Sequence, residues 1–251
     1  MLTLSEDLWS NFRKISLEEM EKVKLMNRVD TKFIAPVSKL IPMLEMAMER
    51  YFVQEIEEKN NMPYFTRYYD TLDYDMYYQH QRGKKVRQKI RTRLYEGTMQ
   101  YPFLEIKSKN NKGRTRKKRV LMEPGEDFLL YPDFFNKYSD YQAELLVPTL
   151  ENHFYRVTLV NHTLTERITL DTDLEIFNLQ TGSFISLDKI AIIEWKRDGR
   201  AMTHDLENIL RTLRIPESGF SKYCVGIAMT DKALPSNRLK QKIRMIEKMQ
   251  N

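Results

Sequence analysis

Residues 84–95 read KKVRQKIRTRLY, and this stretch decides the fold because its charge alternates with the period of a β-strand. Successive side chains of a strand point to opposite faces, so the parity of a residue number assigns it to a face. The even positions after Lys84 are mostly apolar, and the odd positions are Lys85, Arg87, Lys89, Arg91, Arg93 and Tyr95. The stretch is therefore predicted to be a strand with one cationic face and one face that packs against a core.

Two further strands continue this pattern. Turn signals at residues 96–97 and 110–113 separate the first strand from expected strands over residues 101–109 and 113–121, which predicts an antiparallel meander. Parity places on the charged side of these two strands Glu105, Lys107, Lys109, Arg114, Arg116 and Lys118. Like charges that face each other across strands destabilise a sheet. Three such strands favour a bound polyanion over the alternative, a solvated sheet face.

The rest of the chain reads as an α+β protein. Further strands are predicted over residues 27–35, 51–57, 64–70, 153–160, 163–171 and 188–196, and helices over 16–26, 36–48, 73–81, 204–213, 221–232 and 237–249. Residues 124–151 are expected to be helical or irregular. If helices cover the apolar faces, the charged faces must line one cavity, so we predict a closed antiparallel β-barrel, a tunnel with a basic interior and helices outside.

Domain organisation follows from the lack of a linker rich in Gly or Ser. We expect a single domain over residues 1–251, with a core of about 24–230 and a basic C-terminal helix in 236–251.

Composition limits the possible partners, the cellular compartment and the kinds of binding site. The chain has 251 residues and a net charge of +6, which points to an anionic partner. One cysteine, acidic residues near the start and no apolar run of about 20 residues predict a cytoplasmic protein without a transmembrane segment. With eight glycines there is no phosphate-binding Gly-rich loop, and the four histidines lack zinc-site spacing. Any phosphate must be held largely by side chains.

Seven motifs then support a resemblance. They are RVDTKF at 28–33, Arg67 with YDT at 69–71, KIRTRLY at 89–95, EIKSK at 105–109, ERITLD at 166–171, EWK at 194–196 and SKY at 221–223. In this order they resemble the VTC domain, the polyphosphate polymerase module of the vacuolar transporter chaperone complex, within the CYTH or triphosphate tunnel metalloenzyme superfamily. The resemblance covers roughly residues 24–230 and implies the same tunnel fold.

The resemblance also implies a chemistry, the transfer of the γ-phosphate of ATP onto a polyphosphate chain with Mn²⁺ or Mg²⁺ as cofactor. Carried over position by position, it implies as phosphate ligands Lys32, Arg91, Arg93, Lys107, Arg167 and Lys222, and as the metal-holding carboxylate Glu194. The expected catalytic group is Lys32, Arg91, Arg93, Glu194 and Lys222. The charged faces add as phosphate-binding candidates Arg28, Arg67, Lys89, Lys109, Arg116, Lys118 and Lys196.

Several functions stay open at this point. Triphosphatases of the superfamily typically begin with a Glu-x-Glu-x-Lys strand, whereas this chain has Arg28, Asp30 and Lys32 at those positions. That departure favours the polymerase without excluding a hydrolase, a cyclase-like enzyme or a silent polyphosphate sensor. The expected partners are ATP and polyphosphate or triphosphate, and a membrane-protein partner remains open. A nucleic-acid-binding module stays open as an alternative from another class. Nucleic acid is nevertheless not the expected partner, because residues 84–95 place only Tyr95 as an aromatic on the basic face. The oligomeric state is not predicted.

Overall fold

The computed structural model describes residues 6–20, 28–96, 101–199 and 205–251. Its helices are α1 (Glu6–Ser10), α2 (Leu17–Met20), α3 (Leu40–Ala47), α4 (Asp75–Gln81), α5 (Pro132–Tyr138), α6 (Asp205–Thr212), α7 (Lys222–Thr230) and α8 (Lys240–Gln250). Its strands are β1 (Arg13–Ile15), β2 (Arg28–Pro36), β3 (Tyr51–Gln54), β4 (Asn61–Thr71), β5 (Arg87–Tyr95), β6 (Phe103–Lys109), β7 (Thr115–Leu121), β8 (Leu146–Asn161), β9 (Glu166–Asn178), β10 (Phe184–Leu187) and β11 (Ile190–Asp198). Short 3₁₀ turns are η1 (Val37–Lys39), η2 (Phe128–Leu130), η3 (Ala143–Leu145) and η4 (Asn237–Leu239).

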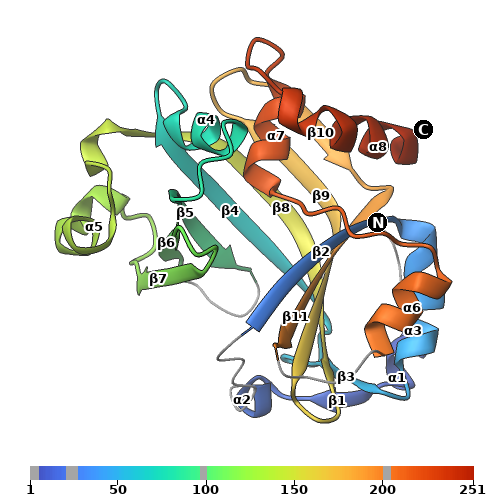
Figure 1. Cartoon of the computed structure of the whole chain (residues 1–251). Helices are drawn as coiled ribbons and strands as arrows, with labels where there is room; N and C mark the ends of the chain where they lie inside the picture. The colour runs from blue at the N-terminus through green and yellow to red at the C-terminus, as the bar shows by residue number, and fades with distance from the viewer. Residues whose placement is uncertain (1–5, 21–27, 97–100, 200–204) are drawn as a thin grey trace.

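The strands form one sheet that curls into a half-barrel (Figure 1). Its antiparallel path runs β2-β11-β9-β8-β4-β5-β6-β7, with β10 on β9, β3 on β8, and β1 parallel to β3. The curvature brings distant strands across from each other, because Lys107 on β6 interacts electrostatically with Lys32 on β2 and Glu194 on β11. The predicted α+β architecture is confirmed. Among the described residues the pairing path ends at β2 and β7, so the sheet forms a half-barrel with these two strands at its edges.

The convex face carries two apolar layers. α3 and α6 pack on one wing against residues such as Phe33, Ile193 and Trp195. On the other wing, η2 and α5 cover Ile90 and other apolar residues that alternate with the cations of β5 and β6. The apolar half of the predicted strand pattern is therefore buried under helices, and the charged half is left to the concave face.

One end of the concave face is filled by α7 and α8. Ile34 and Ile192, which share a face with Lys32 and Glu194, are buried in one cluster with α7 and α8. Asp70, near the C-terminal end of β4, connects β4 with α4 and α7. Its carboxylate accepts hydrogen bonds from backbone N–H groups at the start of α4 and from the Tyr223 hydroxyl of α7. The predicted basic C-terminal helix is α8, and its apolar stripe closes one end of the half-barrel.

The main departure from the predicted elements lies between residues 124 and 160. Strand β8 begins at Leu146 and includes Pro148, within the range 124–151 that was expected to be helical or irregular. The pairing of β8 with β4 shifts between Tyr68 and Tyr69, and the Thr149 hydroxyl donates to the Tyr68 carbonyl. Pro lacks a backbone donor and is tolerated where such a bulge interrupts the ladder.

Other boundaries also differ. A second bulge near Asp173, with φ 48°, lets β9 continue to Asn178 rather than end at 171. Strands β1 and β10 were not predicted, and the expected helix over 16–26 is seen as α2, with residues 21–26 outside the described part of the chain. Within the described residues, no helix combines the length and apolar character needed to cross a bilayer.

Docking of α8 predicts a specific loss of stability. Ile246 is 0% exposed, so Ile246→Ala should lower the free energy of unfolding by about 2–5 kcal/mol, because it leaves a cavity in the cluster between α8 and the sheet. Urea denaturation measures the change. The control is Ile41→Ala on α3, where the side chain is 44% exposed and the expected change is within about 0.5 kcal/mol. Equal effects of the two substitutions would show that α8 is not docked.

Candidate functional site

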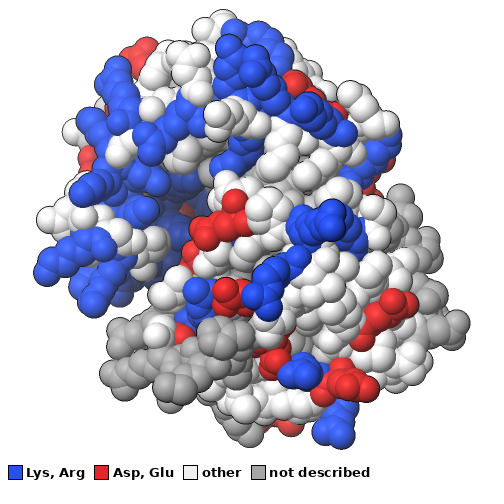
Figure 2. Space-filling view, turned by 45° about the vertical axis from the view of Figure 1, so that its right-hand side comes forward, with Lys and Arg blue, Asp and Glu red and all other residues white. Residues whose placement is uncertain are grey.

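Charged side chains of several strands and of α7 converge on the concave face. Residues directly opposite each other in neighbouring strands share a face, and the register aligns Lys89 with Lys107, Arg91 with Glu105, and Glu194 with Lys32. We call this group the concave cluster; its members are Lys32, Lys89, Arg91, Arg93, Glu105, Lys107, Lys117, Arg156, Asp171, Glu194, Lys196 and Lys222. Figure 2 shows Lys and Arg gathered around a hollow on this side of the molecule. The parity prediction for residues 85–93 is confirmed from Arg87 onward, where β5 begins.

Three carboxylates hold the concave cluster together, and each contacts two cations. The pairs are Glu105 with Arg91 (2.6 Å) and Lys117 (2.9 Å), Asp171 with Arg156 (2.6 Å) and Lys222, and Glu194 with Lys196 (3.0 Å) and Lys32 (3.6 Å). Burial would raise the pKa of Glu194, but Lys32, Lys196, Arg156 and Lys107 together hold it well below its usual value. The pKa values of Glu105 and Asp171 are lowered in the same way by their cations. All three carboxylates are therefore ionised at neutral pH.

Three cations of the cluster lie outside these pairs. In the described part of the chain, Lys89, Arg93 and Lys107 have no carboxylate within salt-bridge distance. Lys89 instead donates to the Ser221 hydroxyl at the N-terminus of α7 (2.7 Å). Arg93 is buried and the two lysines are half-buried. Charges removed from water are normally paired, so this excess of positive charge is a place for an anion.

Arg93 is the most deeply placed of these three cations. It is 7% exposed, donates from Nε to the Thr66 hydroxyl (3.1 Å), and stands over the rings of Tyr64 and Phe154 at 5.6 and 5.9 Å. Burial lowers its pKa, and Arg91 and Arg156 lower it further. Its guanidinium group is thus oriented by neutral partners and forms no salt bridge within the described residues.

The lysines of the cluster are also perturbed. Burial lowers the pKa of Lys107 to about 8, and Lys32 adds to that shift. Burial likewise lowers the pKa values of Lys196 and Lys222 to about 8, although Glu194 and Asp171 act in the opposite direction. A bound anion would raise these pKa values, so the cluster is electrostatically poised to bind one.

Sequence reasoning missed Lys117, Arg156 and Tyr68. Arg156 carries no motif; its only signal is that Phe154, Arg156 and Thr158 share a parity on β8. Tyr68 lies beneath α7 with its ring stacked on Tyr223, and its hydroxyl is 3.4 Å from Arg91. Burial would raise the pKa of Tyr68, but Arg91, Arg93 and Lys222 outweigh it and lower the pKa to about 7.

Several predicted phosphate ligands lie elsewhere. Arg116 and Lys118 are on the convex face, because the turn at 110–114 aligns Lys117, not its even-numbered neighbours, with Lys107. Lys118 stands 5.3 Å from the ring of Tyr138 on α5. Arg67 is also convex, because the β4 register puts Thr66 opposite Arg93, and it pairs with Glu151 at 2.6 Å. The sequence-based placement of these three residues on the charged face is therefore corrected.

The remaining predicted ligands are placed as follows. Lys109 stands opposite Arg87 on the cluster's face, and Arg167 stands opposite Lys196. The side chain of Arg28 lies outside the described residues. The structure thus brings together the expected catalytic group of Lys32, Arg91, Arg93, Glu194 and Lys222, without testing what each does.

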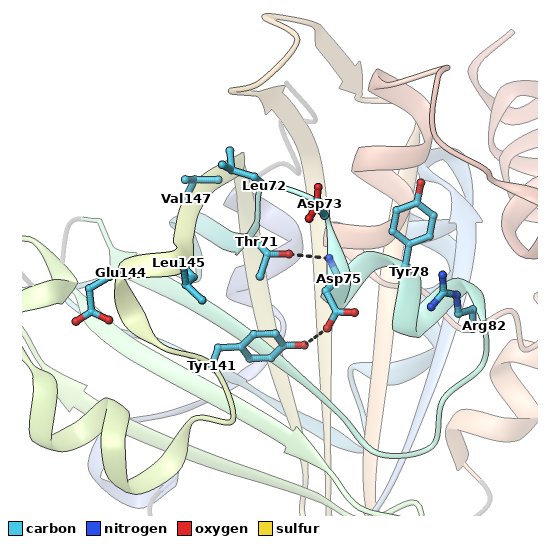
Figure 3. A pocket seen from close by; sticks show the side chains of 10 residues that line it. All are labelled: Thr71, Leu72, Asp73, Asp75, Tyr78, Arg82, Tyr141, Glu144, Leu145 and Val147. Carbon is cyan, nitrogen blue, oxygen red and sulfur yellow. Dashed lines mark hydrogen bonds between the residues drawn. The ribbon is translucent and has the colours of Figure 1, made fainter.

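A separate cavity of about 690 Å³ lies away from the concave cluster, beside the turn between β4 and α4 (Figure 3). Its hydrogen bonds run from the Tyr141 hydroxyl to Asp75 (2.7 Å) and from the Asp75 backbone N–H to the Thr71 hydroxyl (3.0 Å). Asp73, Asp75 and Glu144 line it with a single cation, Arg82. This acidic lining does not suit a phosphate ligand.

The donor set limits how a metal could bind. The described residues contain no group of three or more His, Cys, Asp or Glu side chains arranged for a metal. Glu105 and Asp171 each form two close ion pairs, whereas Glu194 has one at 3.0 Å and one at 3.6 Å. Mg²⁺ is commonly held by one or two carboxylates together with substrate phosphates. The site therefore fits a divalent ion that shares Glu194 with phosphate oxygens.

One family model matches most of the chain. The VTC domain family model matches residues 27–230, which include every strand from β2 to β11 and also α7. Similar solved structures include a putative adenylate cyclase from Bacillus halodurans (14% identity, TM-score 0.49, 78% of this chain and 96% of that chain). A putative adenylyl cyclase from Hippeastrum, described as having a dominant triphosphatase activity, has 15% identity and a TM-score of 0.46 over 84% of this chain and 98% of that one. No curated protein sequence matches the chain.

The partial burial of the charged Lys107 side chain predicts a pH-dependent stability. Its folded pKa of about 8 is below the ordinary value of 10.5, so the unfolded chain binds more protons between these pH values and stability gains from Lys107 as pH rises through that window. Lys107→Met should stabilise the ligand-free protein by roughly 1–3 kcal/mol at pH 7 and by much less near pH 10.

Urea denaturation at both pH values measures this difference. The control is Lys248→Met on the exposed side of α8, which should change stability little at either pH. An equal gain from Lys107→Met at pH 7 and pH 10 would mean that loss of the charge is not the cause.

Proposed function

The chain belongs to the VTC domain family, and from that membership and the concave cluster we propose that it transfers the γ-phosphate of ATP onto a polyphosphate chain held in the half-barrel. The observation that carries this proposal is the buried guanidinium of Arg93, which has no carboxylate partner among the described residues. A phosphate group would supply the missing charge, and arginine binds phosphate with two parallel hydrogen bonds.

The cluster offers phosphates two neighbouring regions. Near α7, Arg93 lies beside Arg156 and Lys222, which are joined through Asp171. On the other side, Lys107 of one wall faces Lys32 and Glu194 of the other. A chain of phosphates that spans both regions would meet cations along its length, whereas a single phosphate would satisfy only part of them.

The chemistry asks little of the protein beyond charge and alignment. The bond between the γ-phosphorus and the oxygen that bridges it to the β-phosphorus breaks, ADP leaves with that electron pair, and a terminal oxygen of the polyphosphate chain forms the new P–O bond. That attacking oxygen is already anionic, so no general base is required. Arg91, Arg93 and Lys222 would stabilise the negative charge on the transferred group.

A divalent ion completes this proposal. Glu194 would hold Mg²⁺ or Mn²⁺ together with phosphate oxygens. The ion would neutralise negative charge on phosphate oxygens that the lysines do not contact. Lys196 and Lys32 flank the same carboxylate and would keep the bound phosphates in line.

Hydrolysis is the second candidate function, because the half-barrel is hollowed and open toward solvent on the face shown in Figure 2. Water would then take the place of the polyphosphate oxygen as acceptor. The two candidates differ in product, since hydrolysis releases inorganic phosphate and polymerisation lengthens the chain.

Arg93→Ala is expected to weaken triphosphate binding at least tenfold, about 1.4 kcal/mol, because the guanidinium that would meet the phosphate is removed, while the protein stays folded. Titration calorimetry with inorganic triphosphate and thermal unfolding measure the two effects. Arg91→Ala is the poorer probe, because it would leave Glu105 with one partner fewer. Arg67→Ala on the convex face is the matched control. Unchanged affinity in Arg93→Ala would refute phosphate binding at this position.

Glu194→Gln should leave polyphosphate affinity equal or higher, because repulsion of the anion falls, yet reduce turnover with ATP and Mn²⁺ by at least about tenfold, or about 1.4 kcal/mol. Steady-state assays across a manganese titration should record polyphosphate and inorganic phosphate separately. Near-normal turnover with the same metal dependence would show that Glu194 only neutralises Lys32 and Lys196. Inorganic phosphate as the only product of the wild-type protein would favour the hydrolase.

A further inference from the structure

Strand β7 and the turn before it carry a dense run of positive charge. Residues 112–119 read KGRTRKKR, and every residue of this run is exposed. We call its cations the basic edge; they are Lys112, Arg114, Arg116, Lys117, Lys118 and Arg119. β7 pairs with β6 and ends the pairing path of the sheet, so the basic edge forms one rim of the half-barrel.

The basic edge continues the concave cluster. On the concave side, Lys117 stands opposite Lys107, which in turn stands opposite Lys89. Neighbouring strands are about 4.8 Å apart, so these three lysines form a row across the sheet. On the convex side, Arg116 and Lys118 carry the positive charge around the rim.

Most of these cations lack an acidic partner. Lys117 binds Glu105, and within the described residues no other member of the basic edge forms a salt bridge. Lys118 and Arg119 instead cover the rings of Tyr138 and Phe103, at 5.3 and 4.5 Å. A few lysines suffice to keep an edge strand from pairing with another chain, so mutual repulsion among six exposed cations needs a further reason.

We propose that the basic edge binds the part of a linear phosphate chain that extends beyond the concave cluster, and guides it over β7 onto the convex face. This inference rests on the proposed function, in that the anion of the concave cluster is taken to be a phosphate chain. A phosphate chain fits better than a nucleic acid, because Phe103 and Tyr138 already have a cation of the basic edge over the ring, where a stacked base would have to displace it. A ligand that reaches both the concave cluster and the basic edge must be longer than triphosphate.

The test compares ligand lengths in a variant that removes only convex charges. In R116A/K118A, the dissociation constant for long-chain polyphosphate should rise about tenfold, and the dependence of log affinity on log salt should fall by about 1.4, at about 0.7 per lost contact. The dissociation constant for inorganic triphosphate should stay within about twofold, because neither side chain reaches the concave face. Fluorescence anisotropy or calorimetry over a range of salt concentrations measures both.

R244A/K248A is the matched control, since it removes the same charge from exposed positions of α8. An equal loss of long-chain affinity in this control would overturn the proposal, because net charge alone would then explain the effect. Unchanged long-chain binding in R116A/K118A would overturn it too. A single-stranded RNA that loses more affinity than polyphosphate would reassign the basic edge to nucleic acid.

The outcome is separable from that of the proposed function. If the basic edge does not bind the phosphate chain, triphosphate binding and its loss in Arg93→Ala would be unaffected. If the proposed function is wrong, triphosphate binding would not depend on Arg93. The long-chain polyphosphate affinities of R116A/K118A and R244A/K248A could still be compared and would still test the basic edge.

Discussion

Pairing of like-charged strands is the constraint on which this structure depends. β5 and β6 face the inside of the half-barrel with lysines and arginines at neighbouring positions, an arrangement that repulsion would disfavour. Glu105, Asp171 and Glu194 make it possible, because each bridges two cations. The carboxylates are fewer than the cations, so they hold the strands together without neutralising the cavity.

The second requirement is a closed end. Asp70 fastens the starts of α4 and α7 to β4, and α7 then places Ser221 against Lys89 and Lys222 against Asp171. The apolar cluster under α7 and α8 excludes water from this end, which strengthens the electrostatic interactions beside it. The perturbed tyrosine Tyr68 lies at this boundary, between the apolar end and the charged hollow.

These features put binding and stability in opposition. Arg93 is buried and Lys107 is half-buried, and neither forms a salt bridge within the described residues, which is unfavourable in the ligand-free protein and favourable once an anion arrives. At the rim, by contrast, the basic edge is exposed and solvated, so water and salt screen its charges. A phosphate chain would thus meet strong, desolvated sites inside and weaker, screened sites outside.

The sequence by itself determined the strand period, the one-sided charge of residues 87–93 and the apolar positions beneath them, because these depend only on alternation along one chain. It also determined the family through its ordered motifs. Only the tertiary structure decided which charged faces meet. The turn at 110–114 set the β6–β7 register and moved Arg116 and Lys118 to the outside, and the β4 register did the same to Arg67. Arg156 and Tyr68 entered the site from strands whose sequence carries no strong signal, since the curvature of the sheet and the seating of α7 depend on packing between distant segments.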